Sequence, residues 1–312
     1  MPARAGGVGP GMDEQRRGLV FGTTAYFAWG LFPLFWRLLE PAGALEVLAH
    51  RVVWSLLFVA LLLAVRRRWG WVRGLGRRRL ALLTAAATVI SVNWGLFIWG
   101  VNNGHVVETS LGYFVNPLVT VLLGMVVLGE RLRRGQYVAL GCGALAVVVL
   151  AVDYGRPPWL ALSLAFSFAA YGLVKKQIGI PAVESLGVET AVIALPALAY
   201  LGWLTASGGS SFAAHGAGHA LLMVLGGPIT AIPLLFFAAA ARRLPLSTVG
   251  LLQYLTPTLQ FATGVLVFHE SMPAARLAGF ALVWLALLVF SVESLRQSRR
   301  VRAAAPPVTV AA

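Results

Sequence analysis

SVNWGLFIWGVNNGHVVETSLGYFVNPLVTVLLGMVVLGE, residues 91–130, decides the fold, because it contains two apolar segments joined by a short polar turn. Each segment is about 20 residues long, the length that an α-helix needs to cross a lipid bilayer. Asn93 and Trp94 interrupt the first segment, and Tyr113, Asn116 and Pro117 interrupt the second. Polar groups that face hydrocarbon are costly. The stretch therefore predicts a transmembrane hairpin whose polar side chains face other helices or a binding site.

Composition extends this prediction to the whole chain. Hydrophobic residues make up 59% of the 312 residues, and the mean hydropathy is +0.80. Charged residues are only 12%, against about 25% in soluble domains. We expect an all-α polytopic membrane protein, embedded in the lipid bilayer, with ten transmembrane helices. They are placed at residues 18–38, 44–65, 80–101, 106–129, 136–153, 158–178, 184–205, 218–240, 246–268 and 275–295.

Basic residues concentrate on one side of these spans. The formal net charge is +14, and 21 Lys and Arg residues fall on the side that carries both termini. The opposite side has two, Arg156 and Arg276. Lys and Arg gather in the cytoplasmic loops of membrane proteins. We therefore expect cytoplasmic termini and a location in the cytoplasmic membrane, and we interpret the basic clusters as topology signals, with no nucleic-acid partner.

The second half of the chain repeats the first. GYFVNPLVTVLLGMVVLGE, ending at Glu130, aligns with LQYLTPTLQFATGVLVFHE, ending at Glu270, so that Pro117 matches Pro257. Five spans per half is an odd number, so the second copy must be inverted in the membrane. Inverted repeats with interrupted spans are typical of secondary transporters, which bind solutes near the midplane between the repeats.

The repeat and the composition divide the chain into four parts. The tails are rich in Gly, Ala, Pro and Arg and are expected to be disordered. The predicted parts are a cytoplasmic tail at 1–17, a five-helix repeat at 18–154, an inverted five-helix repeat at 158–296 and a second cytoplasmic tail at 297–312.

Four stretches carry a resemblance to a known family: AYFAWGLFPLFWRLL (25–39), LEVLAHRVVWS (45–55), SVNWGLFIWGVNNGHVVETSLGYFVNPL (91–118) and LQYLTPTLQF (252–261). Over nearly all of residues 18–296 the sequence resembles the RarD group of EamA-domain proteins, within the drug/metabolite transporter superfamily. The resemblance implies an inner-membrane transporter of small solutes without a nucleotide-driven motor. RarD members carry a chloramphenicol-sensitivity label. We expect a small amphipathic or polar metabolite or drug as the substrate, moved by alternating access.

Depth along the spans predicts a central binding site. At 1.5 Å per residue, Asn93 and Trp94 lie roughly 11–12 Å from the outer end of their span, and Tyr113 and Asn116 roughly 10 and 15 Å from theirs. Aromatic walls with uncharged amides suit a flat or amphipathic solute. The alternative is helix packing, in which the amides bond neighbouring backbones. The predicted lining is Trp29, Asn93, Trp94, Tyr113, Asn116, Tyr171, Gln253 and Tyr254, with Pro117 and Pro257 as hinges.

Charged residues near the non-cytoplasmic ends of the first four spans form a second set. Glu46 and His50 are four residues apart and share a helix face. Glu189, in the second half, is a candidate for coupling to a proton, or else a helix-start carboxylate favoured by the helix dipole. The set forms either a gate for polar solutes or ion pairs that fix packing: Arg37, Glu46, His50, Arg51, Glu108 and Glu189.

Arg51 is the most demanding member of this set. It lies about two turns into its span, deep enough to need a partner. We expect that partner to be a carboxylate or carbonyl, with Glu40, Glu46 and Glu108 as the candidates.

Other chemistry has little support. The sequence has no GxxxxGK[ST] loop and only two lysines, Lys175 and Lys176, which excludes an ATP motor in this chain. It has one cysteine, and its His215-x-x-x-His219 pair lies in a Ser/Gly/Ala loop without nearby acids. We predict no enzyme, cofactor or metal. The alternative to a transporter is a membrane sensor or scaffold that binds a ligand without moving it; the oligomeric state stays open.

Overall fold

A computed structural model describes residues 10–65, 76–178 and 182–304, and within these ranges the only regular structure is helix. The first half contains α1 (Pro10–Gly30), α2 (Phe32–Arg37), α3 (Ala44–Val65), α4 (Arg77–Asn102), α5 (Val106–Leu128) and α6 (Arg134–Tyr154). The second half contains α7 (Trp159–Ile178), α8 (Ala182–Ala206), α9 (Gly216–Ala241), α10 (Leu246–Leu252), α11 (Leu255–Ala262), the π-helical turn η2 (Thr263–Val267) and α12 (Ala274–Ala304).

The predicted spans are helical throughout the described chain. Eight segments are long and apolar enough to cross a membrane, and α7 contributes a shorter apolar helix. The all-α, polytopic fold class is therefore confirmed. Glycine ends two of the helices: Gly129 follows α5 with φ 67° and Gly155 follows α6 with φ 64°. This left-handed conformation favours glycine at a helix C-terminus.

Two spans are interrupted. The first breaks at Leu31, where α2 begins with a proline in its first turn. The ninth breaks at Gln253 and Tyr254, four and three residues before Pro257. Proline has no N–H, so it leaves the carbonyl of Gln253 without a helical donor. The predicted hinge at Pro257 thus lies beside a real break, whereas α5 is continuous across Pro117.

The tails contain more helix than the sequence predicts. Disorder is wrong for residues 10–17 and 297–304, which belong to α1 and α12. Asp13 and Glu14 pair with Arg17 at 3.2 and 3.3 Å, which supports the first turns of α1. Glu14 also lies 2.8 Å from Arg243 of the second half. Residues 1–9 and 305–312 lie outside the described ranges.

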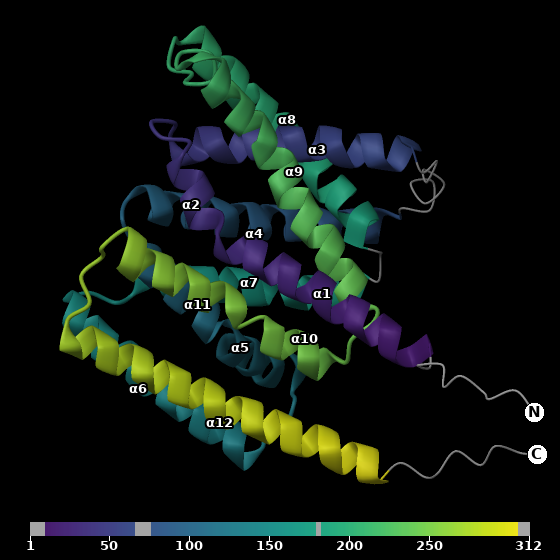
Figure 1. The fold of residues 1–312 in the computed structure, drawn as a ribbon, viewed down its shortest axis with the longest axis vertical. Coiled ribbons are helices and arrows are strands. Elements are labelled where there is room, and N and C mark those ends of the chain that lie inside the picture. The colour runs from purple at the N-terminus through teal and green to yellow at the C-terminus, as the bar shows by residue number, and fades with distance from the viewer. Residues whose placement is uncertain (1–9, 66–75, 179–181, 305–312) are drawn as a thin grey trace, which may run out of the picture.

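The helices pack as one bundle (Figure 1). α6 and α12 lie side by side along one edge, and α3 packs against α8 and α9 at the other. Between them, α7 packs against α4 and α5, and α1 packs against α9 and α11. The start of α1 and the end of α12 lie at the same end of the bundle (Figure 1). We call the opposite end the loop end; it consists of the turns at 38–43, 103–105, 155–158, 207–215 and 268–273.

Candidate functional site

The centre of the bundle contains a buried arginine in an aromatic surrounding. Arg51 on α3 is 4% exposed, and its Nε donates a 2.7 Å hydrogen bond to Oγ1 of Thr230 on α9. Its Cζ lies 3.9 Å from the centre of the Trp94 ring. The rings of Trp36 and Phe32 lie at 5.1 and 5.8 Å. Aromatic faces attract cations at these distances, so aromatic contact is the main compensation that the protein gives this charge.

The expected carboxylate or carbonyl partner of Arg51 is a wrong prediction. Among the described residues, Arg51 has no ion pair, and its hydrogen bond goes to a hydroxyl. Glu40 and Glu108 each pair with a different arginine, and Glu46 accepts hydrogen bonds from the turn after α8. The reason is the direction in which the side chains point. The Arg51 side chain extends toward α4 and α9, whereas the three carboxylates contact residues at the loop end.

Asn93, Trp94 and Tyr113 come together with Arg51, as the depth argument predicts. The Tyr113 hydroxyl donates a 3.3 Å hydrogen bond to Oδ1 of Asn93. It is also near enough to Arg51 for an electrostatic interaction. Four of the predicted residues, from α3, α4 and α5, therefore share one buried layer.

The two asparagines also have the packing role that the sequence left open. Nδ2 of Asn93 donates to the carbonyl of Leu164 at 3.0 Å, and Nδ2 of Asn116 donates to the carbonyl of Ala165 at 3.2 Å. Both carbonyls belong to α7, so amides from α4 and α5 hold α7 between these two helices. Buried polar groups are normally satisfied in this way.

The remaining predicted lining residues have other main contacts. Trp29 packs against Tyr26 and Phe237, and also against the cluster that contains Phe32 and Trp36. Tyr254 packs against the core of α5, α6 and α12. Tyr171 donates a 3.0 Å hydrogen bond to a carboxylate of α8, and Gln253 ends α10. The structure therefore does not gather all eight residues in one cluster, because rotation about each helix axis turns these side chains toward different neighbours.

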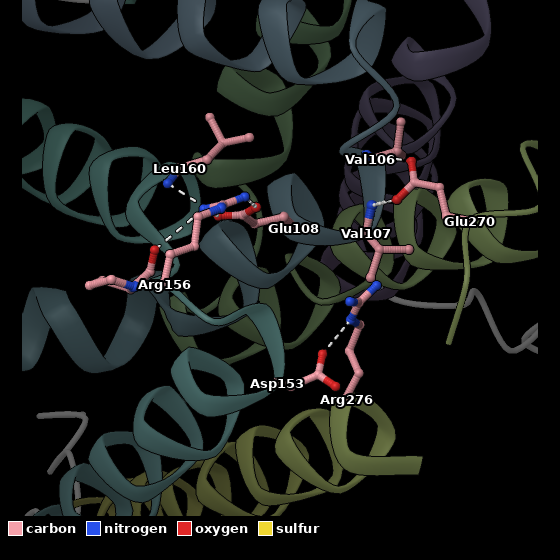
Figure 2. A network of polar contacts seen from close by, with 9 residues as sticks. Val106, Val107, Glu108, Asp153, Arg156, Leu160, Glu270 and Arg276 are labelled. Atoms are coloured by element: carbon pink, nitrogen blue, oxygen red, sulfur yellow. Dashed lines mark hydrogen bonds and ion pairs between the residues drawn. The ribbon is translucent and has the colours of Figure 1, made fainter. Parts of the chain in front are cut away.

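The loop end contains a polar pocket of about 400 Å³. Figure 2 shows the charged network around it. Glu270, after η2, accepts hydrogen bonds from the backbone N–H groups of Val106 at 2.6 Å and Val107 at 2.9 Å, the first residues of α5. Burial raises the pKa of Glu270, against the opposing effect of these two hydrogen bonds. The lining is Gly104, His105, Val107, Glu108, Asp153, Tyr154, Arg156, Glu270, Ser271 and Arg276.

Two ion pairs complete this network (Figure 2). Arg276 of α12 lies 2.8 Å from Asp153 of α6, and Arg156 lies 2.8 Å from Glu108 of α5. Glu108 also accepts a 3.3 Å hydrogen bond from the backbone N–H of Leu160 on α7. The hydrogen bond to Glu108 raises the pKa of Arg156. Together with Glu270, these contacts fasten the ends of α5, α6, α7 and α12 to one another.

Sequence reasoning missed most of this network. It named Glu108, but it used Glu270 only as a marker of the repeat and left Asp153 out. A signal was present, because Arg156 and Arg276 are the only basic residues assigned to the side with few charges. An isolated arginine in a short turn between apolar spans needs an anionic neighbour more than an arginine in a basic cluster does.

Three other predicted residues lie at the loop end. Arg37 pairs with Glu40 at 2.8 Å, with both side chains exposed. Glu46 accepts a 2.7 Å hydrogen bond from the backbone N–H of Ser211, and the His50 ring stacks on Phe212 at 4.6 Å. The shared helix face of Glu46 and His50 is thus confirmed, since both contact the turn after α8.

Glu189 lies between α7 and α8 and lines a small pocket together with Trp94. It is 3% exposed, and its carboxylate lies 2.5 Å from Nζ of Lys175 and 2.6 Å from Oγ of Ser185. Tyr171 donates to its other oxygen at 3.0 Å. Glu189 therefore forms a buried ion pair in the second turn of α8, and it does not lie at the first residue of that helix, where the helix dipole would favour a carboxylate.

No group of three or more His, Cys, Asp or Glu residues in the described ranges could hold a metal ion. Nε2 of His219, from the predicted histidine pair, lies 3.0 Å from the carbonyl of Leu39.

The helices and their buried charged sites define a multi-pass membrane protein. Residues 16–152 match the EamA-like transporter family. Protein RarD of Streptomyces exfoliatus is 60% identical over 304 residues, which cover 96% of each chain. Protein RarD of Escherichia coli is 40% identical, covering 92% of this chain and 98% of its own. Chloramphenicol-sensitive protein RarD of Pseudomonas aeruginosa is 34% identical, with coverages of 93% and 98%.

The chain therefore belongs to the RarD-type EamA transporters, within the drug/metabolite transporters. A chain in a solved crystal structure has the same fold, with a TM-score of 0.58 over 90% of this chain and 98% of its own, at 18% identity.

Proposed function

We propose that this protein is a secondary transporter that moves a small amphipathic or polar organic solute across the cytoplasmic membrane by alternating access. The observation that carries the proposal is the contact between Glu270 and the N-terminus of α5, together with the sequence repeat, which assigns a corresponding contact to Glu130 at the other end of the bundle. These two contacts would be the outer and inner closures.

The corresponding contact follows from the sequence repeat. The backbone N–H of Glu270 donates to the carbonyl of Gly264 at 3.0 Å, and the N–H of Glu130 donates to Gly124 at 3.2 Å. α10 begins at Leu246, 140 positions after the Val106 that begins α5, and the same spacing separates the two glutamates. If Glu270 closes on the start of α5, the repeat assigns Glu130 to the start of α10.

The packing of helices supports two inverted repeats at 18–154 and 158–296. Each span of one half has a counterpart five spans away in the other half. When every span is replaced by its counterpart, the α5–α7 contact becomes the α11–α1 contact. The same exchange turns α4–α7 into α9–α1, and α3–α9 into α8–α4. It leaves α6–α12 and α3–α8 as pairs that map onto themselves. Such symmetry lets one sequence pattern build closures at both ends of a transporter.

We place the loop end on the outside. The start of α1 and the end of α12 lie at the opposite end of the bundle. The sequence assigns 21 basic residues to the side of the termini, which favours the cytoplasm for that side. At the loop end, Glu270–Val106, Arg276–Asp153 and Glu108–Leu160 each join one proposed repeat to the other. Breaking these contacts would open the outer side, and a solute that favours one state would shift the balance.

A proton is the candidate coupling ion, and Glu189 its candidate carrier. Its carboxylate is buried, as proton-relay carboxylates in membrane segments are. Lys175 and Tyr171 hold it on the half of the bundle nearer the termini, where it would exchange partners when the inner side opens.

Flux is the decisive experiment. Purified protein in proteoliposomes would be given a defined mixture of organic solutes, with and without a proton gradient, and the trapped solutes measured by mass spectrometry. The proposal expects at least one solute to accumulate above protein-free liposomes. Binding of solutes without any accumulation would favour the alternative, a sensor or scaffold that retains the fold.

A further inference from the structure

We infer that Arg51 is the anion-binding element of the substrate site, and that the substrate is an organic monoanion whose carboxylate lies next to an aromatic or aliphatic body. The inference rests on the proposed transport function and specifies the chemical class of the solute.

Arg51 is a buried cation that has no acidic partner among the described residues. The carboxylates Glu108, Asp153 and Glu189 each have a basic partner, and the buried Glu46 accepts hydrogen bonds from Ser210 and Ser211. Arg51 is 4% exposed and has one hydrogen bond, from Nε to Thr230. A guanidinium has five N–H donors, and a buried charge without an ionic partner is unfavourable. The protein maintains this arrangement without an acid of its own, so an acid from outside is the natural complement.

The free donors have the geometry that a carboxylate needs. The bond to Thr230 uses Nε and fixes the guanidinium, which leaves the two terminal nitrogens for a forked pair of hydrogen bonds. A second donor in the same cluster also has no partner, since Nε1 of the fully buried Trp36 makes no hydrogen bond. Two unpartnered donors in one apolar cluster favour an acceptor that carries negative charge.

The surroundings define the rest of the solute. Trp94 covers the guanidinium at 3.9 Å, and Trp36 and Phe32 lie within 6 Å of it, so the walls around the charge are aromatic. Arg51 is the single cation in this cluster, which matches one negative charge. The contacts come from α2, α3 and α4 of the first half and from α9 of the second, which places the charge between the proposed repeats.

Binding to purified protein tests the inference without requiring transport. The probes are acetate, hexanoate, benzoate and 3-phenylpropanoate, each compared with its uncharged amide at equal concentration. The readout is the midpoint of thermal unfolding over a concentration series. We expect at least one of the larger carboxylates to raise the midpoint saturably while its amide does not. In Arg51→Gln, its apparent affinity should fall at least tenfold.

Two further comparisons separate binding from structure. Arg17→Gln, which changes an exposed arginine of α1, should bind as the natural protein does. Without any probe, Arg51→Gln should unfold at the same temperature as the natural protein or higher, because it removes a buried charge that has no acidic partner while the amide can still bond Thr230.

The inference is overturned if no carboxylate raises the midpoint, if amides act as well as carboxylates, or if Arg51→Gln retains the affinity. Arg51-dependent carboxylate binding without flux in proteoliposomes would contradict the transport proposal and leave this inference standing. Flux of an uncharged solute that Arg51→Gln does not change would contradict this inference and leave the transport proposal standing.

Discussion

Glu270 holds the start of α5: one oxygen of its carboxylate lies 2.6 Å from the backbone nitrogen of Val106. The two residues are 164 positions apart, in different halves of the chain. The first N–H groups of a helix have no partner within the helix. A single side chain from the second half therefore satisfies the start of a first-half helix, and its removal would free that end.

Glu270→Ala should open the loop end. It leaves the N–H groups of Val106 and Val107 without their acceptor, a loss of about 1 kcal/mol, or about fivefold in the open population. A cysteine replacing the buried Ser110 of α5, in a Cys142→Ala background, reports this as faster reaction with an impermeant thiol reagent.

The matched variants are Glu270→Gln, which keeps an acceptor oxygen, and Glu40→Ala, which removes an exposed carboxylate at the same end. Glu40→Ala should label at the rate of the natural protein. Glu270→Gln should label at a rate between those of the natural protein and Glu270→Ala, because its amide can accept from only one of the two N–H groups. Equal rates in all variants would show that Glu270 does not hold the closed state.

Acid should stabilise the closed state through Glu270. Burial raises the pKa of this carboxyl above its ordinary value of 4.5. The closed state therefore binds the proton more tightly than the open or unfolded states, in which the carboxyl is hydrated. By linkage, the contribution of this group to stability rises as the pH falls toward 4.5 from above, and declines as the pH rises through the raised pKa.

The measurement is the labelling rate of the Ser110→Cys protein across this pH window, corrected for the reactivity of a free thiol. We expect slower labelling at lower pH, and no such trend in Glu270→Gln. Faster labelling on acidification would reverse the sign and reject this role for the carboxyl.

Arg156 and Glu108 should be energetically coupled. The Glu108 side chain is 3% exposed, and its carboxylate pairs with Arg156. The Arg156 side chain is 37% exposed, so water partly screens the interaction. A double-mutant cycle with Arg156→Gln and Glu108→Gln should give a coupling of about 1 kcal/mol in the free energy of unfolding. The same cycle on Arg37 and Glu40, both largely exposed, should give a value near zero. Equal couplings would mean that burial adds nothing to the Glu108 pair.

Gly227 should be intolerant of any side chain. A Cβ at this position of α9 would lie 2.4 Å from the backbone carbon of Trp54, because α3 and α9 are in close contact. Gly227→Ala should lower the free energy of unfolding by about 1–3 kcal/mol. Gly172→Ala, where a Cβ meets nothing within 4 Å, should be neutral or gain up to about 1 kcal/mol from helix propensity. Similar stabilities for the two variants in detergent would contradict the close α3–α9 packing.

The fold could be predicted from sequence because hydropathy reports it directly. Every predicted span contains helix, and the break near Pro257 follows from a missing N–H. The helical extensions at 10–17 and 297–304 could not be read from composition, because the first depends on side-chain pairs such as Glu14–Arg243, which join distant parts of the chain.

The site could be predicted only in part, because residue counting gives depth and not direction. Asn93 and Tyr113 meet because their helices are consecutive and face each other. Trp29 and Tyr254 were predicted to line the same site but pack into different cores. Charge complementarity within the chain predicts an acidic partner for Arg51, whereas the structure surrounds this cation with aromatic rings.

Reciprocal access at the two ends tests the account most directly. Ser110→Cys reports on the loop end, and Gly250→Cys, 140 positions later on α10, reports on the other end. Impermeant reagent would be applied to right-side-out and inside-out vesicles carrying either Glu270→Ala or Glu130→Ala. The account predicts that Glu270→Ala speeds labelling at Ser110→Cys and slows it at Gly250→Cys, with the opposite pattern for Glu130→Ala. Rates that rise or fall together at both ends, or reporters that label from the same side, would contradict alternating access by inverted repeats.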